Sequence, residues 1–435
     1  MTIRLAVSPL PLLILLAASV VVATTAAGSS ELRAILAAPN ADGVAITLIA
    51  GESATSEHPF FRSLGSGGRA CATCHVPSQG WTLVPADVQR RFDASAGLDP
   101  LFQPHDAAVS PRADVESVEA RRRAYALLLS RGLIRVGRPL PAGADFELAA
   151  VDDPYRFASA AELSLFRRPL PATNVRFLTT VTWDGRASHG ARAIVNDLLA
   201  QASDAANTHA PGTALDDEQR RLIVTFERAL LTAQAHDRRV GALDGERALG
   251  GPRALAEQPF QFAINSFLDQ TGRPPTRRVF TLFDAWASSS DEARRAIVRG
   301  QALFNERALG SPRVTCSGCH NAPNVGSSST GAFFDGVSGE ADPALPLYTL
   351  RCLKGPLAGQ TLRTTDPGWG LVTGRCADVG KFKVPALRAL AGRAPYFHNG
   401  SAATLDDVIH SYDRRFAAGL SARDTQDLVA FLRAL

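Results

Sequence analysis

Two copies of one cysteine pattern constrain this chain more than any other feature of its sequence. The copies are Cys71-Ala72-Thr73-Cys74-His75 and Cys316-Ser317-Gly318-Cys319-His320, each with the spacing C-x-x-C-H. Two thiols three positions apart lie on one face of a helical turn, from which they can form thioethers with both vinyl groups of one porphyrin. The histidine that follows can then bind the iron. The pattern therefore predicts two covalently bound c-type haems.

Two other kinds of site also use paired cysteines, namely a four-cysteine zinc site and a redox-active dithiol. Neither requires a histidine after the second thiol, and histidine supplies only 9 of the 435 residues. We therefore interpret both motifs as haem attachment sites, with the histidines as proximal iron ligands. The residues expected to hold the two haems are Cys71, Cys74, His75, Cys316, Cys319 and His320.

The last two cysteines, Cys352 and Cys376, have no histidine after them. In an oxidising compartment the expected fate of such a pair is a disulfide, which here would close the loop between the two residues.

The N-terminus predicts export. Arg4 precedes an apolar run from Leu10 to Val22, and small residues follow at 23–28. This order is typical of a signal peptide, which we place at residues 1–27. An uncleaved anchor is the alternative. No later apolar run is long enough to cross a bilayer, so we expect no membrane span in the mature chain.

The composition predicts a folded enzyme-sized protein and gives no sign of a nucleic-acid partner. Hydrophobic residues make up 46% of the chain and charged residues 20%, which is enough to form two ordinary domain cores. The formal net charge is +4, and the basic residues form no dense stripe.

The chain also contains signs of an internal duplication. Matching segments precede and follow each motif, at 58–62 and 301–305 before it and at 171–175 and 385–389 after it. On this alignment, Trp183 in the first half corresponds to His398 in the second.

We therefore predict a mainly α fold with two cytochrome-c-like haem domains related by internal duplication, joined by long loops. Apolar residues at helical spacing between Ala293 and Phe304 predict an amphipathic helix before the second motif. The Gly250-Gly251-Pro252 segment is typical of a connection. We place the N-terminal haem domain at residues 28–250 and the C-terminal haem domain at residues 251–435.

Several longer motifs make the chain resemble a known family. Trp183-Asp184-Gly185-Arg186 follows the first haem motif. The segments 381–388 and 394–401 follow the second. In this order they resemble the bacterial di-haem cytochrome c peroxidase and MauG family. The resemblance runs from about Phe60 to Tyr412. It implies a periplasmic enzyme whose N-terminal haem reacts with hydrogen peroxide and whose C-terminal haem transfers electrons.

One position separates the branches of that family. Fourteen residues after the histidine of the Phe-His-x-Gly segment, conventional peroxidases have a methionine that binds the C-terminal iron, and MauG-like enzymes have a tyrosine. Counting from His398 gives Tyr412, and the only methionine in this chain is Met1. The resemblance thus implies Tyr412 as an iron ligand, and the alternative is that it packs in a C-terminal helix. A phenolate favours oxidised iron more than a thioether does.

Trp183 occupies the family's position for a tryptophan between the two haems. The resemblance implies that it relays electrons, and the alternative is a core aromatic residue.

Proton transfer at the N-terminal haem requires a residue that this chain does not have at the usual place. The family has Gln and Glu ten and twenty residues after the tryptophan, where Ala193 and Ser203 stand here. Gln201 and His209 are the nearest candidates, since an imidazole can accept and return a proton near neutral pH. A surface position for His209 is the alternative. His105 and His189 are weaker candidates, and the alternative role for either is a reversible sixth ligand to the N-terminal iron.

The resemblance also implies a calcium ion between the domains. Arg393 stands where the family usually has a threonine, and its charge opposes a cation. Asn174 is the candidate side-chain ligand from the first half.

These observations predict an enzyme that uses hydrogen peroxide to oxidise a partner protein in the periplasm. Two alternatives remain, a conventional peroxidase that takes electrons from a small donor cytochrome and a non-catalytic electron-transfer protein. Among these three functions, Tyr412 favours the oxidation of a partner protein.

Overall fold

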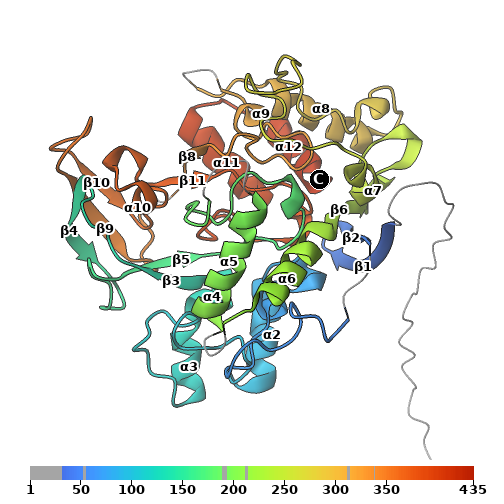
Figure 1. Cartoon of the computed structure of the whole chain (residues 1–435). Helices are drawn as coiled ribbons and strands as arrows, with labels where there is room; N and C mark the ends of the chain where they lie inside the picture. The colour runs from blue at the N-terminus through green and yellow to red at the C-terminus, as the bar shows by residue number, and fades with distance from the viewer. Residues whose placement is uncertain (1–31, 52–54, 189–193, 211–213, 311–313, 338) are drawn as a thin grey trace, which may run out of the picture.

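The computed structural model describes residues 32–51, 55–188, 194–210, 214–310, 314–337 and 339–435 (Figure 1). The predicted signal peptide, residues 1–27, lies outside these ranges. Within them, no helix is long and apolar enough to span a membrane.

Helices carry both haem motifs. In Figure 1, α8, α9, α11 and α12 gather at the top, α2, α3 and α4 lie at the bottom, and α5 and α6 stand side by side between them. The described ranges hold twelve α-helices, namely α1 (Cys71–Cys74), α2 (Pro85–Ser95), α3 (Val118–Ala124), α4 (Ala126–Arg131), α5 (Ile194–His209), α6 (Asp217–Ala229), α7 (Gly251–Ala256), α8 (Glu292–Glu306), α9 (Cys316–Cys319), α10 (Gly370–Thr373), α11 (Leu405–Phe416) and α12 (Ala422–Arg433).

Within the described part of the chain, four small antiparallel sheets accompany the helices. Their strand orders are β1-β2-β6-β7, β10-β9-β4, β11-β8 and β3-β5. The strands are β1 (Leu32–Asn40), β2 (Gly43–Ala50), β3 (Ile134–Arg138), β4 (Phe146–Asp152), β5 (Leu163–Arg167), β6 (Leu230–Asp237), β7 (Gly241–Ala242), β8 (Phe333–Asp335), β9 (Leu347–Cys352), β10 (Thr361–Thr364) and β11 (Lys381–Lys383). The prediction of a mainly α fold is therefore confirmed only in part, because helices and small sheets both build the structure.

The helix predicted before the second motif is present as α8. Its N-terminus is capped by Asp291, whose carboxylate accepts from the backbone N–H of Ala293. Its buried face includes Ile297 and Phe304, which lie in the core that α8 shares with α12. Gly300 allows the two helices to approach closely, because a Cβ there would lie 1.9 Å from the backbone oxygen of Asp427. The amphipathic pattern thus buries the face that the sequence predicted.

Helices α5 and α6 form one wall of the N-terminal half. A capping box between Asp216 and Gln219 begins α6. Ile223, Val224 and Phe226 then turn inward and join a core that also contains residues of β2, β6 and α5. This packing places the inner faces of α5 and α6 opposite the first haem motif.

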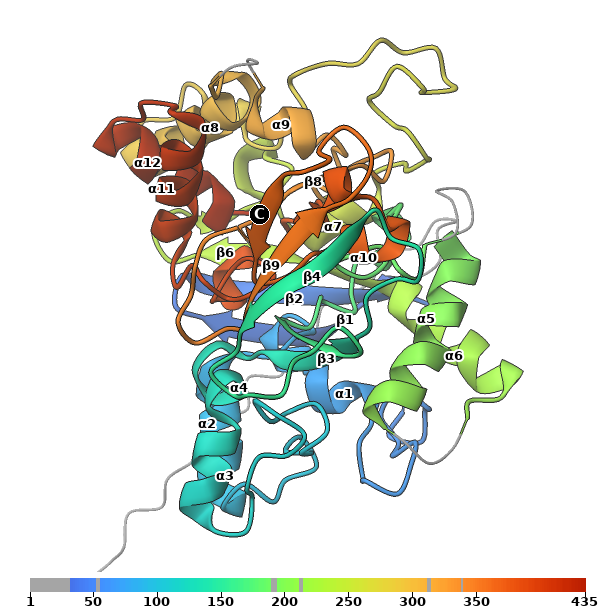
Figure 2. The same ribbon diagram turned by 90° about the vertical axis from the view of Figure 1, so that its left-hand side faces the viewer.

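The two halves of the chain share one of the sheets. Strand β4 of the first half pairs with β9 of the second, from Phe146 opposite Cys352 to Asp152 opposite Leu347. Figure 2 shows this sheet at the front of the molecule. The proposed boundary at residue 250 remains a prediction, and the shared sheet means that the halves are joined by backbone hydrogen bonds.

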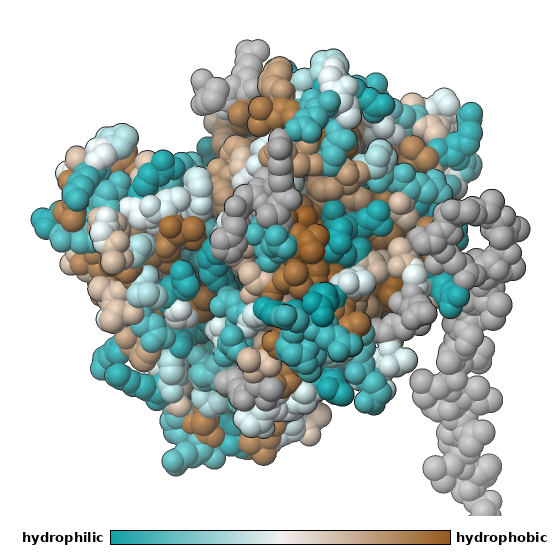
Figure 3. Space-filling view, in the orientation of Figure 1, coloured by the Kyte–Doolittle hydropathy of each residue, from teal (hydrophilic) through white to brown (hydrophobic). Residues whose placement is uncertain are grey.

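The surface is mixed in character. On the face shown in Figure 3, apolar patches are scattered among hydrophilic residues and form no continuous band.

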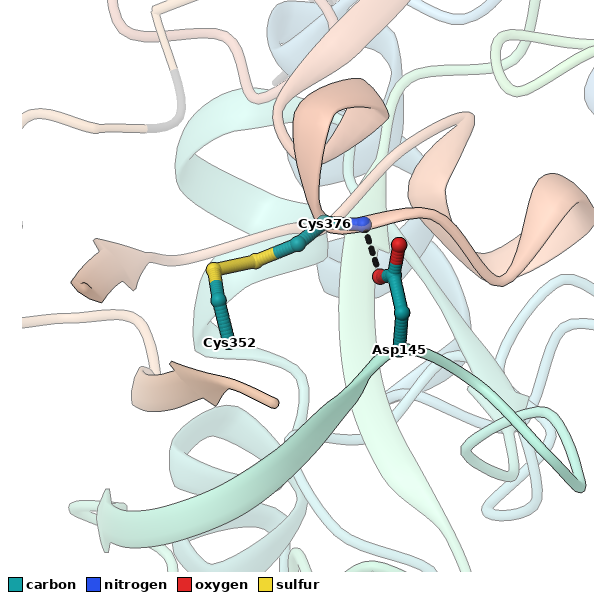
Figure 4. Close-up of a disulfide and its surroundings, with 3 residues drawn as sticks. All are labelled: Asp145, Cys352 and Cys376. Carbon is teal, nitrogen blue, oxygen red and sulfur yellow. Dashed lines mark hydrogen bonds between the residues drawn. A yellow bond between two sulfur atoms is a disulfide. The ribbon is translucent and has the colours of Figure 1, made fainter. Parts of the chain in front are cut away.

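The predicted disulfide between Cys352 and Cys376 is confirmed (Figure 4). It joins the end of β9 to a short 3-10 helix at Cys376–Asp378, with the two Cα atoms 5.8 Å apart. The carboxylate of Asp145, from the segment before β4, accepts a hydrogen bond from the backbone N–H of Cys376. The disulfide therefore joins two segments of the second half, and the hydrogen bond to Asp145 links them to the first half.

Candidate functional site

The first haem motif forms a short helix that opens onto a cavity. Cys71 and Cys74 are the ends of α1, and both are free thiols. His75 follows directly, and its Nδ1 lies 3.3 Å from the backbone oxygen of Trp81, to which it can donate. With Nδ1 as the donor, the lone pair of the neutral ring lies on Nε2, which is the arrangement of a metal-binding histidine. All three motif residues line the same cavity.

The chemistry of this cavity fits haem c. Burial lowers the pKa of His75 to about 4, so the imidazole is neutral at pH 7 and its free nitrogen can bind iron. Burial also raises the pKa of Cys71 to about 12, which suits a thioether sulphur that carries no charge. Much of the wall is apolar, as a porphyrin face requires. The apolar residues of the wall include Ile134, Val136, Leu170, Leu178, Val181 and Leu198.

His209 reaches the same cavity from the C-terminal end of α5. Its Nδ1 lies 2.7 Å from Oδ2 of Asp106, and Arg69 donates to the same oxygen over 2.7 Å. Asp106 and Arg69 are both 3% exposed, whereas His209 is 30% exposed. Burial opposes the ionisation of Asp106, but the hydrogen bonds from His209 and Arg69 and the charge of Arg69 outweigh it and lower the pKa of Asp106 to about 2. An ionised carboxylate therefore holds His209 at the cavity.

The other candidates for proton transfer lie in different places. Gln201 also lines the cavity, about two turns before His209 on α5. Ser203 turns back to its own helix, where its hydroxyl lies 3.4 Å from the backbone oxygen of Leu199. His105 is absent from the cavity wall, and its Nε2 lies 3.5 Å from Asp106. Ala193 and His189 fall outside the described residues. Among the described candidates, the structure thus brings His209 and Gln201 to the cavity.

Trp183 forms another part of the cavity wall. Its indole N–H donates to the backbone oxygen of Arg168 over 2.8 Å, which fixes the ring. Its ring centroid lies 6.2 Å from that of His398, the residue to which the duplication aligns it. His398 is buried and stacks on Phe382 of β11 with a centroid distance of 4.0 Å. The two counterpart residues therefore meet where the halves of the chain join.

A buried ion network surrounds this contact. Arg167, at the end of β5, donates to Asp184 over 2.6 Å and to Asp366 over 2.6 and 2.9 Å. All three side chains are at most 3% exposed. Asp184 follows Trp183 directly, and Asp366 belongs to the second half of the chain. The network thus holds the loop of Trp183 against the second half.

The second haem motif repeats the geometry of the first. Cys316 and Cys319 are the ends of α9 and are free thiols. His320 follows, and its Nδ1 is hydrogen-bonded to the backbone oxygen of Gly326, six residues later, as His75 is to the residue six positions after it. Burial lowers the pKa of His320 to about 4, so this imidazole is also neutral. The repetition supports both the duplication and a second haem.

Tyr412 lies in α11 close to the second motif. Burial, together with the nearby thiols of Cys316 and Cys319, raises the pKa of Tyr412 to about 12 in the absence of a metal. The phenol ring packs against Phe397 and Phe416 with centroid distances of 5.9 and 6.0 Å. Tyr412 thus lies near both thiols of the second motif, and its role as an iron ligand stays a prediction.

Three residues of the first cavity were missed by the sequence analysis, namely Asp106, Glu227 and Lys383. Burial alone raises the pKa of Glu227 to about 8 and lowers that of Lys383 to about 8. Glu227 follows the buried Phe226 of α6, so an acidic residue on the inner face of an amphipathic helix was a usable signal. Lys383 belongs to the segment 381–388 of the second half, and nothing in that motif indicates a contact with the first haem motif.

The predicted calcium ion receives no support from the side chain of Asn174. Its Oδ1 accepts from the backbone N–H of Thr232 over 2.9 Å, and its Nδ2 donates to the oxygen of the same residue over 2.8 Å. Arg393 is buried, and its charge opposes a cation as expected. In the ranges that the structure describes, no group of three or more His, Cys, Asp or Glu residues could hold a metal ion. The calcium site remains a prediction.

Sequence comparison relates part of the chain to curated peroxidases. Cytochrome-c peroxidase IdrP1 of Denitromonas iodatirespirans is 33% identical over 173 residues, which is 35% of this chain and 44% of that protein. Cytochrome c551 peroxidase of Nitrosomonas europaea is 33% identical over 158 residues, covering 35% of this chain and 38% of that protein. The chain thus matches less than half the length of either relative. No protein-family model matches the chain.

Solved structures resemble the chain more loosely. A MauG-like protein associated with microbial copper homeostasis is 16% identical and covers 87% of this chain and 86% of its own, with a TM-score of 0.40. A variant of the diheme peroxidase BthA from Burkholderia thailandensis is also 16% identical and covers 92% of this chain and 94% of its own, with a TM-score of 0.31.

Proposed function

We propose that this chain, a relative of the di-haem cytochrome c peroxidases and MauG-like proteins, reduces hydrogen peroxide at its first cavity and uses the resulting oxidising power on a partner protein. The observation that carries the proposal is the set of residues around that cavity. A haem attachment motif, a histidine held by a buried carboxylate and a tryptophan that contacts the second half all line one space. The fold and the export signal expected from the sequence suit a periplasmic enzyme.

The first cavity divides its tasks among a few residues. Cys71 and Cys74 would anchor the porphyrin, and His75 would bind the iron with its free Nε2. When bound, this haem supplies the metal that binds peroxide and the electrons that break its O–O bond. His209 accepts a proton from the oxygen that stays bound and returns it to the oxygen that leaves as water. Gln201, which lines the same cavity, would orient the peroxide by hydrogen bonding.

Trp183 and His398 lie on the proposed electron-transfer route between the two halves. The indole lines the first cavity and contacts His398, which lies in the segment fourteen residues before Tyr412. The buried ion network of Arg167 holds Trp183 in place, so its ring can relay electrons without a change of position.

Tyr412 would set the function of the second site. A phenolate ligand stabilises oxidised iron, so the C-terminal haem would store an oxidising equivalent and accept electrons slowly from a donor cytochrome. A long-lived oxidised state can wait for a docked protein and oxidise its surface side chains. A methionine ligand would instead favour the conventional peroxidase, and this chain offers none.

The proposal is tested by following the oxidised state that one equivalent of peroxide produces. We expect a wild-type state that survives for seconds or longer in the absence of a partner, because the two sites share the oxidising equivalents. Trp183→Phe should shorten that lifetime at least tenfold, since the relay between the sites is lost. Stopped-flow absorption spectroscopy of the purified holoprotein measures both lifetimes.

Trp369→Phe is the matched control, because Trp369 is a partly buried tryptophan that stacks on Phe333 and is absent from the first cavity wall. It should leave the lifetime unchanged. If the wild-type state decays within milliseconds, or if reduced cytochrome c is oxidised with the efficiency of a typical enzyme, the conventional peroxidase is the correct function.

A further inference from the structure

Asp106 is the centre of a buried cluster in the wall of the first cavity. Its Oδ2 atom accepts hydrogen bonds from Arg69 and from Nδ1 of His209, each over 2.7 Å, and His105 Nε2 lies 3.5 Å away. The carboxylate is 3% exposed, and no feature of the sequence analysis had indicated it. Its surroundings keep it ionised, so it acts as an acceptor that cannot donate.

Arg69 connects this cluster to the haem attachment segment. The residue lies two positions before Cys71, and its guanidinium also donates to the backbone oxygens of Pro100, Leu101 and His209. One buried side chain therefore fixes both the loop that carries Asp106 and the last residue of α5. Arg69 thus links the attachment segment to His209 through hydrogen bonds.

The hydrogen bond to Asp106 determines which nitrogen of His209 carries the proton. Because an ionised carboxylate only accepts, the proton of the neutral imidazole must reside on Nδ1. Nε2 then has a free lone pair, and His209 is one of the residues of the cavity wall. The opposite tautomer would present an N–H group and could not take a proton.

From this geometry we propose that Asp106 is a positioning residue that holds His209 in the tautomer and orientation needed to accept the proton of bound peroxide. The inference rests on the proposed function and adds a residue to it. When Nε2 accepts the proton, the positive charge of the imidazolium lies beside the Asp106 carboxylate. When Nε2 returns it to the departing oxygen, water leaves, and the transfer consumes no net proton.

The charged and titratable groups that face His209 from neighbouring elements agree with this role. Asp106 is the only carboxylate hydrogen-bonded to it among the described residues, and Arg69 donates both to that carboxylate and to the backbone oxygen of His209. Burial lowers the pKa of His105 and that of His75, so both are neutral at pH 7 and add no competing positive charge. The group that His209 contacts through Nδ1 is thus an ionised carboxylate, which can only accept.

The test combines the tautomer of His209 with the rate of the peroxide reaction in three variants. Asp106→Ala removes the acceptor, Asp106→Asn keeps an acceptor oxygen without the charge, and His209→Ala identifies the signals of that residue. The tautomer is read from 15N NMR of histidine-labelled holoprotein in the reduced, carbon monoxide-bound form. The control is Asp99→Asn. It neutralises another carboxylate of the connection that carries Asp106, one that pairs with Arg91 of α2.

We expect His209 to carry its proton on Nδ1 in the wild type and in Asp106→Asn, and to become a mixture of tautomers in Asp106→Ala. The rate constant with peroxide should fall about tenfold or more in Asp106→Ala, because general base catalysis is worth about 10²- to 10⁴-fold in total. Asp106→Asn should lie between this variant and the wild type. Asp99→Asn should match the wild type in both measurements.

A tautomer that is unchanged in Asp106→Ala would overturn the inference, and so would a wild-type rate in that variant. Failure of the proposed function gives a different pattern. In that case the wild type itself does not react with peroxide, while the NMR signals still decide whether Asp106 positions His209. Haem content, measured on every variant, shows that each protein has folded around its cofactors.

Discussion

Tyr412 is the residue on which the candidate functions differ most. It lies in α11 near the thiols of Cys316 and Cys319, and its environment disfavours the phenolate unless a cation is present. A ferric iron would supply that cation, since metal binding strongly favours the deprotonated ligand. The residue is therefore either an iron ligand or a neutral phenol packed against Phe397 and Phe416.

We expect Tyr412→Phe to change the absorption and magnetic circular dichroism spectra of the C-terminal haem alone. Phenylalanine fills the same space and removes only the oxygen that binds iron. Tyr155→Phe is the control, because the hydroxyl of Tyr155 donates to the backbone oxygen of Ala344 far from either motif. An unaltered spectrum in Tyr412→Phe would remove this tyrosine as a ligand.

The haem-binding residues could be predicted from the sequence because each set is contiguous. Cys71, Cys74 and His75 follow one another within a single turn, so their spacing reports their geometry directly. Asp106 could not be found in this way. It lies 103 positions before His209, and only the folded chain brings the two together. Local patterns carry no information about such a contact.

At the scale of elements, the helices were easier to predict than the strands. The apolar period of α8 extends over several turns, whereas β8 and β11 have three residues each. The pairing of β4 with β9 depends on residues about 200 positions apart. The expected mainly α fold missed these sheets, because short strands paired over long distances leave no periodic signal.

The contact between α8 and α12 gives a prediction at this scale. Gly300→Ala would place a methyl group on the backbone of Asp427, so the helices must move apart. We expect a loss of about 1 to 3 kcal/mol in the free energy of unfolding, as for overpacked cores. Thermal unfolding followed by circular dichroism measures the loss.

Gly245→Ala is the matched control, because a Cβ at Gly245 meets no atom within 4 Å. Its unfolding temperature should stay close to that of the wild type. Equal stability of the two variants would mean that α8 and α12 can separate without cost, contrary to the packing described above.

At the scale of the whole molecule, the two halves are joined by contacts that also serve the proposed function. They share the sheet of β4 and β9, and Arg167 links Asp184 of one half to Asp366 of the other. Trp183 and His398 meet beside this network. The internal duplication predicted two similar units. In the structure, the corresponding residues Trp183 and His398 face each other.

In the proposed function, two haems share the oxidising equivalents of one peroxide molecule. Electron paramagnetic resonance of the ferric holoprotein, frozen before and after one equivalent of peroxide, tests this sharing most directly. We predict two distinct ferric signals per chain before the addition and the loss of both afterwards. Loss of only the N-terminal signal, with the other ferric signal intact, would contradict the sharing of oxidising equivalents between the two haems.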